Sequence, residues 1–448
     1  MTMPRKKDRP IELLLMGNGG TKACSVKMTS RVFDSKPELV FNMEQVNISP
    51  PEGRGACPYC VVRKIDEKKY KNVFELAVRG NLNDSDEMPY QLKLKFSAEP
   101  YRVKVEGEMT ELPPDVKLNA FNTCFQSRLF SEENHPPFEM ARKSFAFFED
   151  GGLGWISDAE RGRSEYHVES DDGGPWIQLF KTRKFFDSVF SWSTSKSFMA
   201  SPLVGWVADD NSYMITVASE NAYHVGIRWG PCLHSDAAAQ INERGNPRFR
   251  SLVYIVPADI NVLMKMYKQD FGAESPLTPI PEDGLWPYTK GILLGIFEGD
   301  DLNSWSASHG TLKPYESRGT WINGNLQKVA YPEGVTEGRG SALWEVPVGK
   351  GEAVLSRSIK LDRTHPLTHV ALDAVNRGNL DAGIDVLVEV DHKPVTQRAF
   401  LLRYWANRRL LVPIPVQTKS GELRLSLRVR EGDEPLRIVL DNLRGFPG

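Results

Sequence analysis

Apolar and charged residues alternate along much of this chain, and that alternation limits what it can fold into. Gln91–Phe96 and Tyr101–Glu106 place an apolar side chain at every second position. Because neighbouring side chains of a β-strand point to opposite faces, this period of two predicts strands with one buried and one wet face. Such strands belong to antiparallel sheets, since parallel strands are usually buried on both faces. We therefore predict an all-β protein.

Similar β-rich runs recur through the first half of the chain, separated by polar, glycine or proline breaks. This pattern is typical of a large antiparallel β-sandwich rather than of βαβ units. One helix is expected, at Ala258–Phe271, because its apolar residues follow helical spacing between Pro257 and Gly272. The predicted strands are Glu12–Met16, Glu38–Asn42, Tyr59–Lys64, Val73–Arg79, Tyr90–Phe96, Tyr101–Glu108, Val116–Phe125, Lys143–Phe148, Pro175–Phe180, Ser188–Trp192, Phe198–Val207, Tyr213–Ala218 and Phe249–Val256.

A proline-rich segment divides the chain into two domains. Residues 274–287 contain four prolines, which disfavour regular structure and make a stiff linker. Two domains also suit a length of 448 residues, which exceeds what one hydrophobic core usually serves. We expect a large β-sandwich, the candidate catalytic domain, at 1–272, the linker at 273–290 and a second domain at 291–448.

The second domain contains three recognisable motifs. Ile296–Trp305, Gly338–Val346 and Ile438–Leu443 resemble the opening, middle and closing strands of galactose-binding-like jelly-roll domains, which are carbohydrate-binding-module-like. The resemblance implies a C-terminal jelly-roll β-sandwich. Members often hold a structural Ca²⁺ through a glutamate of the first motif and an aspartate near the end, which match Glu298 and Asp441 here. Asparagine at 442 replaces the second acid of the closing pair, which lowers the charge available to the ion.

Reactive and sugar-stacking side chains are concentrated in Ala218–Asp236, which we interpret as a strand with a following loop. A polar group also precedes it in the chain, because Asn122, Cys124, Gln126 and Arg128 alternate and so share one face of a strand. That face is either a polar floor that hydrogen-bonds a ligand or a solvated strand face. The side chains of interest in the later segment are Tyr223, His224, Arg228, Trp229, Cys232, His234 and Asp236.

These residue types suit β-elimination of a uronic-acid polysaccharide. The reaction removes the proton α to a carboxylate, so it requires a base and cationic or amide groups that neutralise the carboxylate as the enolate develops. We predict a polysaccharide lyase that needs no cofactor for catalysis. The expected acids or bases are Tyr223, His224 and His234, and Arg228 would hold the carboxylate. The expected substrate-binding residues are Asn122, Gln126, Arg128, Trp229 and Asp236.

Three other interpretations stay open at this point. A glycosidase would place two carboxylates across the scissile bond, with candidates Glu139, Glu149, Asp209, Glu220 and Asp236. A zinc site would use Cys232, His234 and Asp236, together with His224. Alternatively the chain is a non-catalytic glycan-binding or scaffold protein with structural histidines. An aromatic-rich sandwich linked to a jelly-roll domain is the architecture of many polysaccharide lyases and hydrolases, which favours an enzyme.

The amino-acid composition limits the kinds of ligand and the cellular location that can be expected. The 56 lysines and arginines nearly cancel the 58 aspartates and glutamates, so no strong field attracts nucleic acid. A polysaccharide or oligosaccharide is the expected partner, and 10 Trp, 13 Tyr and 21 Phe can supply flat faces for sugar rings. No apolar stretch is long enough to cross a bilayer. We expect a soluble protein, secreted or periplasmic if a leader precedes it.

The five cysteines are too few for a disulfide framework. Cys57-Pro-Tyr-Cys60 resembles the glutaredoxin active-site tetrapeptide, whose reactive thiol needs a helix N-terminus after a strand. The context here is a loop followed by a strand, so a structural pair or free thiols are expected instead. Whether Cys57 pairs with Cys60, or Cys124 with Cys232, stays open.

Overall fold

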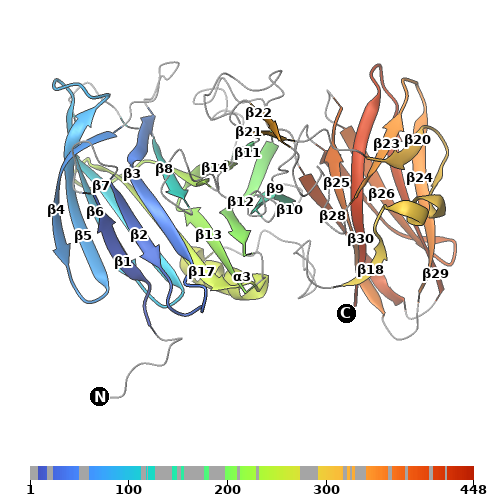
Figure 1. Ribbon diagram of the computed structural model, residues 1–448, viewed down its shortest axis with the longest axis horizontal. Coiled ribbons are helices and arrows are strands. Elements are labelled where there is room, and N and C mark those ends of the chain that lie inside the picture. Colours follow the sequence, from blue (N-terminus) through green and yellow to red (C-terminus); the bar gives the residue numbers. More distant parts are fainter. Residues whose placement is uncertain are drawn as a thin grey trace. The chain divides into compact units, whose positions relative to one another are not determined.

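The computed structural model confirms the prediction of an all-β protein. Strands make up most of the described residues, together with the helix α3 (Ile260–Phe271) and the short 3-10 helix η2 (Gly299–Ser304) (Figure 1). Two compact units divide the chain: unit 1 is Met1–Ala146 with Trp176–Glu274, and unit 2 is Phe147–Pro175 with Ser275–Gly448. The structure describes residues 9–17, 24–49, 60–112, 118, 120–126, 144–148, 153–155, 176–180, 197–208, 212–228, 232–272, 291–315, 320–322, 325–327, 340–361, 366–378, 382–402, 407–418 and 421–447.

Unit 1 contains two sheets, which we call sheet 1 and sheet 2. Each strand of sheet 1 pairs antiparallel with the next. In spatial order these strands are β1 (Glu12–Met16), β2 (Ser25–Thr29), β3 (Glu38–Ser49), β8 (Ala120–Gln126), β15 (Cys232–Ala238), β14 (Ala222–Arg228) and β11 (Trp176–Phe180).

Sheet 2 is also antiparallel throughout. In spatial order its strands are β4 (Cys60–Lys69), β5 (Val73–Leu82), β6 (Pro89–Ala98), β7 (Arg102–Glu111), β17 (Pro247–Pro257), β13 (Tyr213–Ser219) and β12 (Ser197–Val207). The short β16 (Gln240–Ile241) pairs with β17. The pair between β11 and β12 is parallel, which links the ends of the two sheets.

Aromatic side chains join the two sheets of unit 1 face to face. Phe41 on β3 lies 5.7 Å from Phe96 on β6, and Phe121 on β8 lies 4.8 Å from Phe249 on β17, measured between ring centroids. Buried residues alternate with more exposed ones along β6 and β7, as the period-two pattern predicts. The core of unit 1 therefore lies between the sheets.

The helix α3 is the one that the sequence predicts, with two fewer residues at its start. Asp259 caps it by accepting a hydrogen bond of 2.9 Å from the backbone N–H of Asn261. Gly272 ends it in the left-handed conformation, at φ 63°, which glycine adopts without steric cost. No helix among the described residues is both long and apolar enough to span a bilayer.

Unit 2 is a second two-layer sandwich, with a continuous core that includes Phe297, Trp344 and Leu425. Its first layer, sheet 3, is β20 (Thr311–Pro314), β23 (Ala342–Val346), β30 (Leu436–Pro447), β25 (Leu367–Asn376), β28 (Asn407–Thr418) and β10 (Leu153–Trp155), with β18 (Ile292–Gly295) also on β30. Its second layer, sheet 4, is β19 (Ser306–Ala307), β24 (Glu352–Leu361), β29 (Gly421–Arg430), β26 (Ala382–Val390) and β27 (Lys393–Leu402). The remaining strands are β9 (Ser144–Phe148), β21 (Thr320–Ile322) and β22 (Asn325–Gln327).

The structure differs from the sequence predictions in two segments. The interpretation of Ala218–Asp236 as one strand with a following loop is wrong in part, because Cys232–Ala238 forms β15, which pairs with both β14 and β8. No strand is predicted at Ser25–Thr29, where the structure has β2, although polar and apolar residues alternate along Ser-Val-Lys-Met-Thr. Ser188–Trp192 and the linker at 273–290 lie outside the described residues, and Phe147–Pro175 falls in unit 2.

Candidate functional site

Three neighbouring strands of sheet 1 bring the two predicted polar groups together. β15 pairs with β14 on one side and with β8 on the other. Leu233 is opposite Phe125, and Ala237 is opposite Phe121, so residues 122–124 of β8 run beside residues 234–236 of β15. The amide-bearing strand and the histidine-bearing strands therefore meet, although 113 residues separate Thr123 from Asp236 in the chain.

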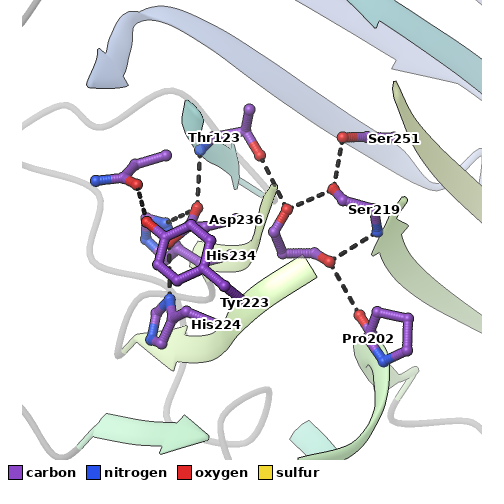
Figure 2. Close-up of polar contacts among 10 residues, drawn as sticks. Thr123, Pro202, Ser219, Tyr223, His224, His234, Asp236 and Ser251 are labelled. Carbon is purple, nitrogen blue, oxygen red and sulfur yellow. Dashed lines mark hydrogen bonds and ion pairs between the residues drawn. The ribbon is translucent and has the colours of Figure 1, made fainter. Parts of the chain in front are cut away.

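Asp236 is the centre of this cluster. Its Oδ2 atom lies 2.7 Å from Nδ1 of His224, and its Oδ1 atom accepts a hydrogen bond of 2.8 Å from the backbone N–H of Thr123 (Figure 2). The Nδ1 atom of His234 lies 3.8 Å from Oδ1 of the same carboxylate. One carboxylate thus faces two imidazoles and a backbone donor, and we call these four residues the Asp236 cluster.

The carboxylate of Asp236 is ionised although it is buried. Burial raises its pKa, but hydrogen bonds and charge from His224 and then from His234 outweigh burial and hold the pKa below its usual range. An ionised acceptor requires that Nδ1 of His224 carry a proton and donate it. The Asp236 cluster therefore fixes the orientation of this imidazole ring.

Exposure separates the two histidines. The side chains of Asp236 and His224 are each 2% exposed, whereas that of His234 is 16% exposed. His234 therefore has the greater access to a ligand, and the buried pair behind it can hold its ring. The two histidines therefore differ in their access to solvent.

Tyr223 joins the cluster because β14 is irregular. The register between β14 and β15 shifts between Ala222 and His224, as in a β-bulge. A regular strand would turn Tyr223 and His224 to opposite faces, but here their ring centroids are 6.3 Å apart. The Tyr223 hydroxyl donates a hydrogen bond to Oδ1 of Asn122, and both side chains are buried.

A serine network supports the cluster from the adjoining strands (Figure 2). The backbone N–H of Ser219 donates to Oγ of Ser235 over 2.8 Å, and the Ser235 hydroxyl donates to the carbonyl of Pro202 over 3.0 Å. Oγ of Ser219 and Oγ of Ser251 lie 2.7 Å apart. Ser235 is adjacent to Asp236, so β12, β13 and β17 of sheet 2 constrain the strand that carries the carboxylate.

The sequence prediction includes none of these serines, and it turns Thr123 to the opposite face. Thr123 contributes through its backbone N–H, which every residue but proline has, so no side-chain pattern marks it. The spacing of Ser219, Ser235 and Ser251 gives no local signal either, because their contacts cross between strands. Only the strand pairing reveals them.

Several predicted site residues can be placed, and others cannot. Asn122 and Gln126 are buried, so the alternative of a solvated strand face is wrong for them: neighbouring strands and the opposite sheet cover β8. Arg228 ends β14, but its side chain lies outside the described part of the structure, as does that of Cys232. Arg128 and Trp229 also lie outside it.

The glycosidase and zinc interpretations gain little from the described residues. Glu220 forms an ion pair with Arg250, and Asp236 is engaged with the two histidines. Glu139, Glu149 and Asp209 lie outside the described residues. Among the residues that the structure describes, no group of three or more His, Cys, Asp or Glu side chains has a geometry that could hold a metal ion.

The cysteines argue against redox chemistry. Cys60 is a free thiol, so a pair between Cys57 and Cys60 is wrong. Burial raises the pKa of the Cys60 thiol to about 12, which disfavours the reactive thiolate at neutral pH. Cys24 is also free and buried, whereas Cys124 is disulfide-bonded.

The two carboxylates matched to the calcium site of the jelly-roll resemblance lie on adjacent segments of unit 2. Oε1 of Glu298 accepts a hydrogen bond of 2.6 Å from the backbone N–H of Gly340. Ala342, two residues later, pairs with Leu440, which precedes Asp441. Asp441 is fully buried. Glu298 lies between β18 and η2, whereas Asp441 lies on β30.

No protein-family model and no curated protein matches the sequence. Similar solved structures include the module TmCBM61 in complex with β-1,4-galactotriose, at 12% identity and TM-score 0.26, covering 36% of this chain and 100% of that chain. Another is the N-terminal cellulose-binding domain of Cellulomonas fimi β-1,4-glucanase C, at 12% identity and TM-score 0.23, covering 35% of this chain and 97% of that chain. An exo-β-agarase matches at 13% identity and TM-score 0.28, covering 35% of this chain and 25% of that chain.

Proposed function

We propose that the protein is a carbohydrate-active lyase that cleaves uronic-acid-containing polysaccharides by β-elimination, with His234 as the base. The observation that carries the proposal is the difference between the two imidazoles that face Asp236. His234 is partly exposed, and it is backed by a buried, ionised carboxylate that His224 and Thr123 hold in place. A catalytic base that acts on a polymer must be accessible to the substrate, and its ring must be held in a fixed orientation.

The proposed reaction breaks two bonds of a uronate residue in the polymer. His234 takes the proton from the carbon α to the carboxylate, and the electron pair of that C–H bond forms a double bond to the neighbouring carbon. The bond from that carbon to the glycosidic oxygen breaks, and the leaving oxygen takes a proton from solvent, because the Tyr223 hydroxyl is buried and donates to Asn122. The products are one chain with an unsaturated uronate end and one with a new hydroxyl.

The other proposed roles follow from charge and position. Arg228 would neutralise the substrate carboxylate as negative charge develops on it. Asn122 and Gln126 are buried, so their proposed role is to hold the strands of the site in place. Arg128 and Trp229 complete the predicted binding residues. Asp236 and His224 are too buried for substrate contact, so we propose that they position the ring of His234.

Product analysis tests the proposal directly. The protein is incubated with a panel of acidic and neutral polysaccharides while absorbance of unsaturated uronate and release of reducing ends are followed together. We expect both signals from an acidic polymer, and loss of both in His234→Ala. The matched control is His309→Ala, because His309 is half exposed and belongs to unit 2, whereas the Asp236 cluster belongs to unit 1.

The same experiment separates the alternatives. Reducing ends without unsaturated product would make the protein a glycoside hydrolase, and binding without either would make it a glycan-binding or scaffold protein. Full turnover by both His234→Ala and Arg228→Ala would overturn the assigned site while leaving the reaction class standing. Because the proposed substrate is an extracellular polymer, the proposal includes secretion or a periplasmic location.

A second proposal concerns unit 2, where we propose a structural Ca²⁺ held by Glu298 and Asp441. The jelly-roll resemblance supports it, together with the hydrogen bond from Gly340 to Glu298 and the pairing of β23 with β30, the strand that carries Asp441. The ion would tie the segment after β18 to β30 and would take no part in the reaction of unit 1.

A further inference from the structure

A pocket at the edge of sheet 1 carries an excess of positive charge. It has a volume of about 410 Å³ and lies between β1, β2 and the turn that joins β4 to β5. Five of its lining side chains are basic and two are acidic, a net charge of +3, whereas the whole chain has a net charge of −2. The basic residues are Lys27, Arg31, Lys36, Lys69 and Lys71, and the acidic ones are Glu12 and Glu38.

Both acids of the pocket already have partners. Arg31 forms an ion pair of 2.7 Å with Glu12, and its hydrogen bond lowers the pKa of Glu12 against the opposing effect of burial. Lys27 forms an ion pair of 3.1 Å with Glu38. These two pairs cancel in charge, so the excess comes from the remaining three lysines.

The three remaining ammonium groups are not neutralised by the pocket itself. Lys69 donates a hydrogen bond of 3.2 Å to the carbonyl of Leu13, which is uncharged. Within the described part of the chain, neither Lys36 nor Lys71 forms an ion pair. A ligand group that enters here therefore meets three positive charges, which favours a carboxylate or a sulfate.

An aromatic ring stands between two of these lysines. Tyr70 is 56% exposed and lines the pocket together with Lys69 and Lys71. Two backbone hydrogen bonds fix the turn that carries Tyr70. The N–H of Tyr70 donates to the carbonyl of Val73 over 2.8 Å, and the N–H of Ala98 donates to the carbonyl of Asn72 over 2.8 Å. A rigid, exposed ring beside ammonium groups suits a sugar ring that bears an acidic group.

The pocket is separate from the Asp236 cluster. β1 lies at one edge of sheet 1, and β2, β3 and β8 stand between it and β15. Glu38, at the start of β3, is the lining residue on the strand nearest to β15, and no residue of the Asp236 cluster lines the pocket. The two sites therefore use different residues.

A second hollow in unit 1 offers a contrast. A groove with a volume of about 800 Å³ crosses the outer face of sheet 2, and its six basic and six acidic side chains cancel. Lys93 is paired in register with Glu108, and Lys95 with Glu106, on the neighbouring strand β7. The groove thus resembles an ordinary solvated sheet face, and its lysines serve as controls for those of the pocket.

We propose that the pocket is a second glycan-binding site, which takes an anionic sugar with its acidic group near Lys36 and Lys71 and its ring on Tyr70. The inference names the same ligand class as the proposed lyase but relies on different residues. A pocket of this size suits a short oligosaccharide. Such a site would hold a polymer on the protein between reaction cycles, or without any reaction.

Calorimetric titration of the full-length chain tests the site. The ligands are a uronate trisaccharide, a sulfated trisaccharide and an unmodified neutral trisaccharide, and the variants are Lys36→Ala with Lys71→Ala, Tyr70→Ala, and the control Lys93→Ala with Lys95→Ala. We expect roughly a tenfold or greater loss of affinity for an acidic trisaccharide in the first two variants, because each loses a direct contact. The control pair should bind like the unchanged chain.

The outcomes distinguish this inference from the proposed function. The original protein could produce no unsaturated uronate while the variant with Lys36→Ala and Lys71→Ala binds the acidic trisaccharides more weakly. That result would support the pocket and contradict the lyase proposal. Equal affinity for the neutral trisaccharide, or equal losses in the Lys93 and Lys95 variant, would overturn the pocket. Comparing the two acidic trisaccharides shows whether the site selects a carboxylate or a sulfate. If neither of them binds, the proposed site is wrong.

Discussion

The Nδ1 atom of His224 and the Oδ2 atom of Asp236 lie 2.7 Å apart in the interior of unit 1. The other carboxylate oxygen accepts the backbone N–H of Thr123, so one side chain holds both an imidazole and a neighbouring strand. Because the strand pairing and the imidazole depend on the same carboxylate, replacing it should disturb stability and activity together.

Removing the charge of Asp236 should destabilise unit 1. Asp236→Asn preserves the shape of the side chain but replaces the carboxylate, which has two charged acceptor oxygens, by a neutral amide. We expect the free energy of unfolding to fall by about 1.5–3 kcal/mol. Urea unfolding measures the difference. Glu220→Gln is the control, because its pair with Arg250 is partly exposed and should contribute less than about 1 kcal/mol. Equal effects of the two substitutions would contradict the central role of Asp236.

The stability of unit 1 should depend on acid pH through Asp236. The pKa of this group is lowered in the folded state, so its contribution is present above the ordinary aspartate pKa of about 3.9 and is lost as pH falls through the folded value. We expect urea midpoints to fall below about pH 4. This part of the pH dependence should be absent in Asp236→Asn. If the urea midpoints of the original protein and of the variant change identically with pH, the prediction is wrong.

A buried ion pair in unit 2 should be sensitive to loss of one partner. Nε of Arg409 lies 2.7 Å from Oδ1 of Asp373, and both side chains are buried. Asp373→Ala leaves a buried guanidinium without this carboxylate, so we expect a loss of about 3–5 kcal/mol in the free energy of unfolding. Combining it with Arg409→Met should restore part of the stability. A double variant no more stable than Asp373→Ala would show that the pair is not the cause.

The thiol of Cys60 should react slowly in the folded protein. It is buried, and burial raises its pKa to about 12, so little thiolate is available to a disulfide reagent at neutral pH. Labelling of Cys60 should become fast only in urea, and peptide mapping of the labelled site measures it. Complete labelling of the native protein within the mixing time would contradict this expectation.

Chelation should lower the melting temperature of unit 2 if calcium is bound there. A ligand present at about 100 times its dissociation constant stabilises the folded state by about 2.7 kcal/mol, which scanning calorimetry detects readily. Glu298→Gln with Asp441→Asn should melt at the same temperature with and without calcium. An unchanged melting curve of the original protein after chelation would remove the calcium proposal.

Local patterns predict the strands and the helix because they depend on neighbouring residues. The alternation in Gln91–Phe96 matches β6, and Asp259 and Gly272 are the kinds of residue that begin and end a helix. At Ser25–Thr29 the alternation of Val26 and Met28 with polar residues does mark a strand, β2, which the sequence prediction omits.

The site is less predictable because its contacts depend on strand pairing. The sequence identifies His224, His234, Asn122 and Tyr223 as chemically notable residues, and the structure groups them. It does not predict the bulge between Ala222 and His224 or the bond from Thr123, since both depend on how β8, β14 and β15 are aligned. Asp236 accordingly changes from an expected substrate contact to a proposed positioning residue.

The separation of 113 residues between Thr123 and Asp236 also has a consequence for biosynthesis. Ribosomes release the N-terminal part of a chain first, and contacts between distant segments form late and slowly. One edge of β8 therefore has no pairing partner until β15 has been synthesised. A nascent chain that stops before residue 232 would expose the edge of β8 to pairing with other strands.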